Sequence, residues 1–138
     1  MTEGAPATPE PGPCIWIVED EPAAAALAVD LCAAAGAVPT VFSAALPFLG
    51  ALRISQPPAA VVLDWRLERE VSAAIFLAIR HRTPDMPVVY WTGSPSANLP
   101  AMISGDDRAR IVDKAAGAAA FEDALAWALG GREEDGAA

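Results

Sequence analysis

The chain has 138 residues, of which 54% are hydrophobic and 20% are charged, a composition typical of one globular α/β domain and not of a disordered chain. Eighteen Asp and Glu against nine Lys and Arg give a formal net charge of -9. A field of that sign repels nucleic-acid phosphate and anionic membrane surfaces, so we expect no nucleic-acid partner and no membrane partner.

Proline and glycine concentrate at the start of the chain, where residues 1–13 read MTEGAPATPEPGP. Residues 131–138, GREEDGAA, are also interpreted as frayed. We therefore expect a flexible N-terminal tail over 1–13, one domain over 14–130 and a flexible C-terminal tail over 131–138. The sequence shows neither a signal peptide nor an apolar stretch of the roughly 18 residues that a membrane span needs, so a cytoplasmic location is expected.

Strand-like and helix-like segments alternate between these tails. Mostly apolar runs predict five strands, at 14–18, 38–42, 59–64, 87–92 and 110–113. Helices are predicted to begin at Pro22, at a Ser43 cap, at Val71 and at Ala118, and the last of them to end at Leu129. Two prolines in 94–107 leave room only for a short or kinked helix there.

Helical spacing also predicts which side of each helix faces the sheet. The predicted buried stripes are Ala24, Leu27, Leu31 and Ala35 in the first helix, Ser72, Ile75, Phe76 and Ile79 in the third, and Phe121, Leu125, Ala128 and Leu129 in the last. Cys14 and Cys32 are interpreted as small buried apolar residues. The only histidine, His81, is interpreted as a surface residue.

This alternation predicts a doubly wound five-stranded parallel sheet with helices on both faces. Ligands of such sheets bind beyond the carboxyl ends of the strands. Polar side chains stand at those ends in this sequence: Glu19, Asp20, Asp64, Thr92 and Lys114. We expect them to converge on one rim.

Three of these residues are carboxylates, which are the hard oxygen ligands that suit Mg²⁺. A carboxylate is also a nucleophile towards phosphorus, and a metal ion with a lysine neutralises the charge of a transferring phosphoryl group. The simpler alternative is that Glu19, Asp20 and Glu21 only favour the positive amino end of the first helix.

In this order and spacing, the residues resemble the receiver domain of two-component response regulators over roughly residues 14–130. The motifs that carry the resemblance are IVEDEP, VVLDW, VVYWTGS and IVDK. Asp20 and Asp64 are separated by 44 residues, Asp64 and Thr92 by 28, and Thr92 and Lys114 by 22. The first and last spacings agree with the family, and the middle one is slightly short. The resemblance implies the flavodoxin-like (βα)5 receiver fold, with strand order 2-1-3-4-5.

By this resemblance, Asp64 is the phosphoacceptor, and Thr92 and Lys114 contact the phosphoryl group. The implied Mg²⁺ ligands are Glu19, Asp20, Asp64 and the backbone carbonyl of Arg66. The donor would be a histidine kinase or a histidine phosphotransfer protein, and the output a phosphorelay or contact with an unknown downstream protein. The face of the fourth helix, fifth strand and fifth helix would switch on phosphorylation and is a candidate homodimer interface. Apart from self-phosphorylation and self-dephosphorylation, the chain is then not an enzyme.

The chain departs from the family pattern on both sides of the lysine. Ala115 replaces the family's usual proline, which normally follows a cis peptide bond that helps to aim the lysine. A cis bond before a residue other than proline costs about 2.5–4 kcal/mol. We therefore expect a trans Lys114–Ala115 bond that aims Lys114 differently. Ile111 replaces the switch aromatic three residues before the lysine, and an aliphatic side chain cannot make a ring swing.

Other positions are candidate modulators. Arg66 places a cation two residues after Asp64, Glu68 stands where the family usually has proline, and Ser94 follows the Thr92 strand. Trp127 lies off the apolar stripe of the last helix, as a partner contact or as a ring lying flat on its own helix.

Two alternatives to a phosphorylated receiver remain. One is a degenerate receiver that binds partners without phosphorylation, which Ala115 and Ile111 favour. The other is a phosphatase of the haloacid-dehalogenase type, a class that needs a second acid two residues after its nucleophile. Arg66 occupies that position in this chain.

Overall fold

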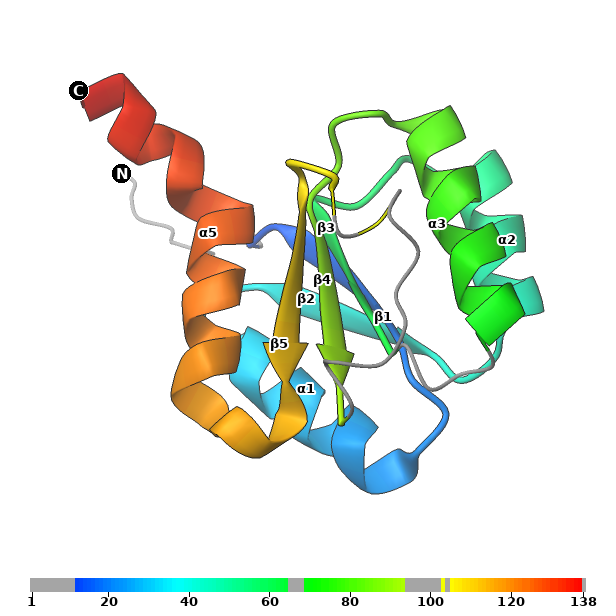
Figure 1. Cartoon of the computed structure of the whole chain (residues 1–138), viewed down its shortest axis with the longest axis horizontal. Coiled ribbons are helices and arrows are strands. Elements are labelled where there is room, and N and C mark those ends of the chain that lie inside the picture. The colour runs from blue at the N-terminus through cyan, green and yellow to red at the C-terminus, as the bar shows by residue number, and fades with distance from the viewer. Residues whose placement is uncertain (1–11, 65–68, 94–102, 104, 138) are drawn as a thin grey trace, which may run out of the picture.

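The computed structural model describes residues 12–64, 69–93, 103 and 105–137, and these form a parallel sheet with helices on both faces (Figure 1). The sheet order is β2-β1-β3-β4-β5 and every pairing is parallel. The strands are β1 (Cys14–Val18), β2 (Val38–Phe42), β3 (Ala60–Leu63), β4 (Val88–Thr92) and β5 (Ala109–Asp113). The predicted fold class and strand order are therefore confirmed, and each strand is found within one residue of its predicted ends.

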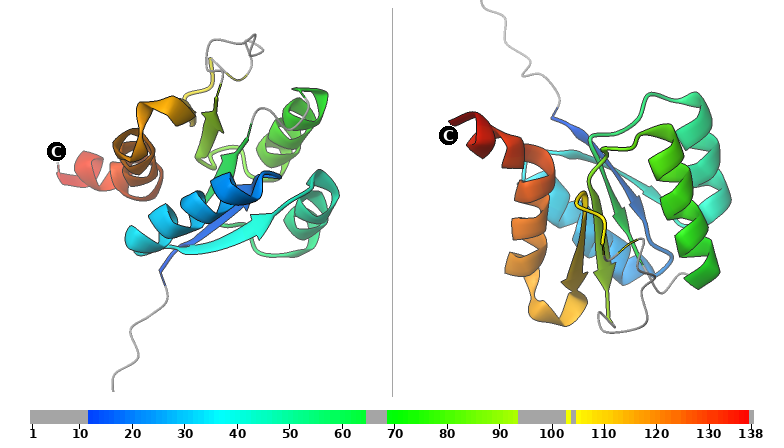
Figure 2. Two further views of the ribbon diagram at one scale, coloured as in Figure 1. Left: turned by 90° about the horizontal axis from the view of Figure 1, so that it is seen from below. Right: turned by 45° about the horizontal axis from the view of Figure 1, so that its top comes forward.

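The helices form two layers. They are α1 (Pro22–Ala34), α2 (Ala45–Ile54), α3 (Arg69–Arg82) and α5 (Ala118–Ala137), with a 3-10 turn, η1 (Lys114–Ala116), before α5. Figures 1 and 2 show α1 and α5 on one face of the sheet and α2 and α3 on the other. Among the helices that the structure describes, none is both long and apolar enough to cross a bilayer.

The three central strands are buried on both faces, which explains their continuous apolar sequences. Successive side chains of β1, β3 and β4 alternate between two cores. Val18, Leu63 and Tyr90 pack with α2 and α3, whereas Ile17 and Val62 pack in the core under α1 and α5. All of them are fully or almost fully buried, so this packing fixes the sheet and with it the level at which each strand ends.

The predicted buried stripe of α1 is only partly confirmed, because Ala24 and Leu31 are half-buried against the core whereas Leu27 and Ala35 are exposed. Ala28 and Cys32 are the buried residues of this helix, and Leu27 is 45% exposed. Because α1 is apolar almost all round, its sequence does not distinguish one face from another. Cys14 is exposed, which corrects its assignment to the core, whereas Cys32 is buried as predicted.

Three helix ends also differ from the prediction, and one of them is the start of α3, which lies at Arg69 and not at Val71. The N-cap of α2 is Ala44 and not Ser43, and no side chain caps this helix. The last helix continues past Leu129 to Ala137, since the good helix formers in the sequence REE follow the two glycines at 130–131. The buried stripes of α3 and α5 are as predicted for Ile75, Phe76, Ile79, Phe121, Leu125 and Ala128.

Arg80 of α3 ties its helix to the segment that leads into β5. Its Nε and Nη2 donate to the two carboxylate oxygens of Asp106 at 2.8 and 2.9 Å. Two further bonds go to the backbone carbonyls of Met86 and Arg108, at 2.7 and 3.1 Å. These charge-assisted hydrogen bonds hold the pKa of Asp106 below its ordinary value.

We expect Arg80→Met to lower the free energy of unfolding by about 2–4 kcal/mol, because it leaves a partly buried carboxylate and two carbonyls without their donor. Urea denaturation measures the change. Arg53→Met is the matched control: Arg53 is exposed, and its loss should alter stability by less than about 0.5 kcal/mol. Equal effects of the two substitutions would contradict this role of Arg80.

Candidate functional site

The carboxyl ends of four strands bring the predicted polar residues to one rim of the sheet, at the lower edge in Figure 1. Glu19 and Asp20 follow β1, and Asp64 follows β3. Thr92 is the last residue of β4, and Lys114 directly follows β5.

Glu19, Asp20 and Asp64 form one acidic cluster. A single oxygen chosen from each carboxylate lies within 4.8 Å of the other two. Glu19 and Asp64 are only 2% and 1% exposed, whereas Asp20 is exposed. The cluster therefore combines two buried carboxylates with one that is open to solvent. This all-oxygen set suits Mg²⁺ better than Zn²⁺.

Lys114 supplies the positive charge in this cluster. Its Nζ lies 3.1 Å from Glu19 Oε1 and 3.7 Å from Asp64 Oδ1. The same ammonium lies 5.1 Å from the centroid of the Trp91 ring, on the strand that ends in Thr92. Lys114 thus joins β5 to the ends of β1 and β3, and its charge offsets part of the repulsion between the two buried carboxylates.

The pKa of Glu19 is raised from 4.5 to about 7. Burial is the largest cause, and a hydrogen bond with Asp64 adds to it, while Lys114 acts in the opposite direction. Without a further cation, Glu19 therefore holds a proton over part of the neutral pH range. A divalent cation would replace that proton and satisfy the same oxygens.

The backbone after β5 explains how Lys114 reaches the site without the family's proline. No peptide bond between described residues is cis, so the expected trans Lys114–Ala115 bond is confirmed. Asp113 Oδ1 accepts a hydrogen bond of 2.8 Å from the N–H of Ala115, a group that proline lacks. This bond caps η1. Lys114 still reaches the acidic cluster, so the substitution at 115 does not turn it away.

Thr92 is fully buried at the end of β4, where it pairs in register with Asp113. Ile111 lies on β5 and is 36% exposed, so the position of the switch aromatic is at the surface. Arg66, Glu68 and Ser94 lie outside the described residues.

Trp127 makes a contact that the sequence did not predict. The guanidinium carbons of Arg110 and Arg108 lie 4.6 and 5.4 Å from the centroid of its ring. The Trp127 indole on α5 therefore packs, through cation–π interactions, against Arg110 of β5 and against Arg108, which directly precedes β5. A role for Trp127 in partner binding stays a prediction.

Sequence reasoning missed two residues that shape the site, Trp91 beside the Lys114 ammonium and Asp113 under the Ala115 amide. Each directly precedes a residue that was identified, Thr92 in one case and Lys114 in the other. Their position next to a predicted site residue was therefore the signal that could have identified them, since the neighbours of a residue at a strand end help to orient its side chain.

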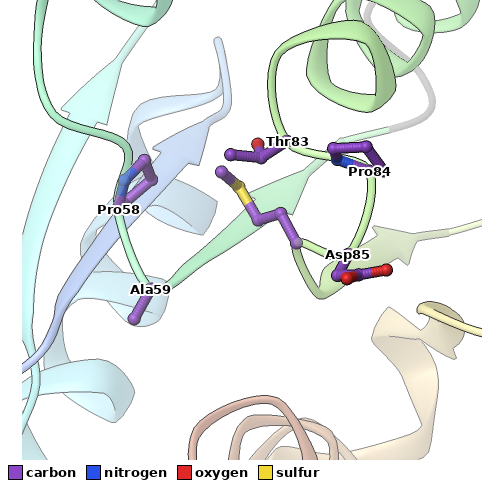
Figure 3. Close-up of a pocket in the computed structure, with 6 residues that line it drawn as sticks. Pro58, Ala59, Thr83, Pro84 and Asp85 are labelled. Carbon is purple, nitrogen blue, oxygen red and sulfur yellow. The ribbon is translucent and has the colours of Figure 1, made fainter.

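A hollow of about 250 Å³ lies at the opposite edge of the sheet. Figure 3 shows Pro58 and Ala59, which precede β3, on one side of it, and Thr83 and Pro84, which follow α3, on the other. Asp85 is the one carboxylate that lines it. The hollow thus lacks the clustered charges that are found at the rim. The rim is therefore the candidate functional site.

No model of a known protein family matches the chain, and no curated protein matches it in sequence. Solved structures do match. The N-terminal domain of a response regulator/sensory box/GGDEF protein from Carboxydothermus hydrogenoformans has a TM-score of 0.75 and 21% identity, covering 88% of this chain and 98% of that one. The signal receiver domain of a putative LuxO repressor from Vibrio parahaemolyticus has a TM-score of 0.75 and 16% identity, covering 90% and 95%.

A third structure is the receiver domain of a sensor histidine kinase from Pseudomonas aeruginosa, which has a magnesium ion coordinated in its active-site cleft. Its TM-score is 0.71 and its identity 18%, over 86% of this chain and 98% of that one. These similarities extend over almost the whole of each domain. The chain therefore has the fold of response regulator receiver domains, as its sequence motifs indicated.

The raised pKa of Glu19 predicts how stability depends on pH in metal-free buffer. Between about pH 4.5 and about pH 7 the folded chain binds more protons at Glu19 than the unfolded chain does, so the free energy of unfolding falls as pH rises through this window. The loss should be on the order of 2–3 kcal/mol. Glu19→Gln removes this titration, so we expect the variant to lose much less stability over the same range.

Urea denaturation at about pH 5 and about pH 8, with EDTA present, measures both profiles. Parallel pH profiles of the wild type and Glu19→Gln would contradict the raised pKa.

Proposed function

We propose that the chain is a receiver that accepts a phosphoryl group on Asp64 from a histidine kinase or a histidine phosphotransfer protein. The observation that supports this most is one buried carboxylate that lies close both to an acidic pair and to an ammonium. Asp64 is 1% exposed, its oxygen clusters with those of Glu19 and Asp20, and Lys114 Nζ lies 3.7 Å away. A nucleophile, a candidate metal site and a cation for the phosphoryl oxygens are thus present together.

In the proposed reaction, an oxygen of Asp64 forms a bond to phosphorus as the phosphorus–nitrogen bond to the donor's imidazole breaks. The product is an aspartyl phosphate and a histidine that takes up a proton. The Lys114 ammonium pairs with a phosphoryl oxygen, and the Thr92 hydroxyl is suited to donate a hydrogen bond to another. Lys114 is already held in place by Glu19, so little reorganisation is needed.

Glu19, Asp20 and Asp64 are the residues that would hold Mg²⁺, with the backbone carbonyl of Arg66 as a further candidate. The chemistry of the donor set fits this ion, and the Pseudomonas aeruginosa receiver binds magnesium in its own cleft. Bound there, Mg²⁺ would neutralise charge on the transferring phosphoryl group. Burial and the neighbouring Asp64 raise the pKa of Glu19 to about 7, which supports the same assignment, because a bound cation would favour the ionised carboxylate.

We further propose that the chain acts in the cytoplasm, by phosphorelay or protein contact, and that its only catalysis is Mg²⁺-dependent self-phosphorylation and self-dephosphorylation. The candidate contact and homodimer face is that of the fourth helix, β5 and α5, and most of the fourth-helix segment lies outside the described residues. Ile111 is exposed there and is not aromatic. This favours the second candidate, a binding module whose contacts do not change on phosphorylation. A partner affinity unchanged by phosphorylation would select it.

We expect the intact mass of the wild type to increase by one phosphoryl group after incubation with acetyl phosphate and Mg²⁺. The increase should vanish when EDTA replaces Mg²⁺, because the three carboxylates then lack the ion that neutralises them. Asp64→Asn is the matched variant and should gain nothing.

Circular dichroism first establishes that both proteins are folded. A folded wild type that gains no mass would contradict phosphoryl acceptance from small donors. An equal gain in Asp64→Asn would move the acceptor to another residue.

A further inference from the structure

The paired helices α2 and α3 expose apolar side chains on the surface that faces away from the sheet. Leu46 and Ile54 of α2 are each 80% exposed, and Leu77 of α3 is 54% exposed. Figures 1 and 2 show the two helices side by side, separated by the sheet from α1 and α5. We call the outer surface of these two helices the α2–α3 surface.

A groove of about 180 Å³ lies in this surface. It is lined by Leu49, Leu52, Arg53, Ala78, His81 and Arg82. Leu49 and Arg53 are one helical turn apart on α2, and Ala78 and Arg82 are one turn apart on α3, so each helix contributes a row with an apolar and a basic residue. Arg82 Nε donates to the carbonyl of Leu52 at 3.2 Å, which joins the helices at the end of the groove.

The charge of this surface is opposite to that of the whole chain. Residues 31–63, which include α2, contain Arg53 as their only charged residue. The one acid in the sequence of α3 is Glu70, near its start, so residues 73–84 contain none. The chain nevertheless carries a net charge of -9. Within the described residues, Arg53, His81 and Arg82 form no ion pair, unlike Arg80, which is paired with Asp106. In the part of the chain that the structure describes, the basic side chains that line the apolar groove are therefore not paired with an acid.

We propose that the α2–α3 surface binds an acidic amphipathic helix of a partner protein. Apolar side chains of that helix would occupy the groove and cover Leu77, while its carboxylates would face Arg53 and His81. The combination of a small apolar groove with a basic rim favours this occupant. A second copy bound symmetrically would place the same basic residues against one another, and like charges repel. The acidic chain as a whole also repels nucleic acids and anionic lipids.

This surface is separate from the phosphoryl site. The groove is formed by the carboxyl-terminal halves of α2 and α3, whereas the acidic cluster lies at the carboxyl ends of the strands, next to the start of α3. In a parallel α/β fold these are opposite edges of the molecule. The inference therefore goes beyond phosphoryl acceptance and does not depend on it.

Fluorescence anisotropy tests the proposal with a labelled helical peptide that carries leucines along one face and glutamates along the other. We expect saturable binding that weakens as salt is added. Arg53→Glu and Leu77→Ser should each weaken it by about tenfold or more, since they remove a basic and an apolar contact. Two controls should bind as the wild type does: Leu27→Ser, which removes an exposed leucine from α1, and Asp64→Asn, which removes the proposed phosphoacceptor.

Several results would overturn the proposal. The first is that the peptide does not bind saturably at concentrations up to millimolar. The second is that a matched peptide, with lysine in place of every glutamate, binds equally well. The third is that Arg53→Glu and Leu77→Ser bind the peptide as tightly as the wild type does. Self-association of the chain that Arg53→Glu abolishes would assign the surface to a second copy. Thermal unfolding of each variant shows that it is folded. Because Asp64→Asn should still bind, failure of phosphorylation and failure of this proposal are distinguishable.

Discussion

The site depends on one constraint, the burial of two carboxylates side by side. Val18 of β1 and Leu63 of β3 are partners in the parallel register, so the residues that follow, Glu19 and Asp64, leave the sheet at nearly the same level. Both are almost completely buried. Two negative charges about 4 Å apart repel by roughly 4 kcal/mol at an effective dielectric of about 20. The sheet therefore creates a place where positive charge is stabilised.

The surrounding structure supplies part of that charge and leaves room for more. Lys114 is carried to the cluster from the far edge strand, β5, and the Asp113–Ala115 hydrogen bond shapes the turn that aims it. Burial, more than any other cause, raises the pKa of Glu19 to about 7, and Lys114 only partly opposes this effect. A divalent cation would complete the balance of charge. The Arg80–Asp106 pair anchors the segment before β5, and so it supports the strand from which Lys114 projects.

The strands, their order and the convergent residues could be predicted from the sequence because central strands buried on both faces have continuous apolar sequences and polar residues mark their ends. The buried face of α1 could not be predicted, because alanines occur on all sides of the helix and Leu27 does not belong to a distinct apolar stripe. Contacts between residues far apart in the chain could not be predicted from the sequence either. The pairing of Arg80 with Asp106 and the packing of Arg110 on Trp127 depend on which elements become neighbours, and local patterns do not record that.

The most direct test of the central claim is a crystal structure of the chain grown with Mg²⁺ near neutral pH. The account predicts an octahedral ion about 2.1 Å from oxygens of at least two of Glu19, Asp20 and Asp64, with water completing its coordination. Lys114 should remain close enough to contact a phosphoryl group beside Asp64. A rim without an ion at saturating Mg²⁺, with Glu19 still bonded to Asp64 and Lys114, would contradict the assignment of this acidic cluster as a metal and phosphoryl site.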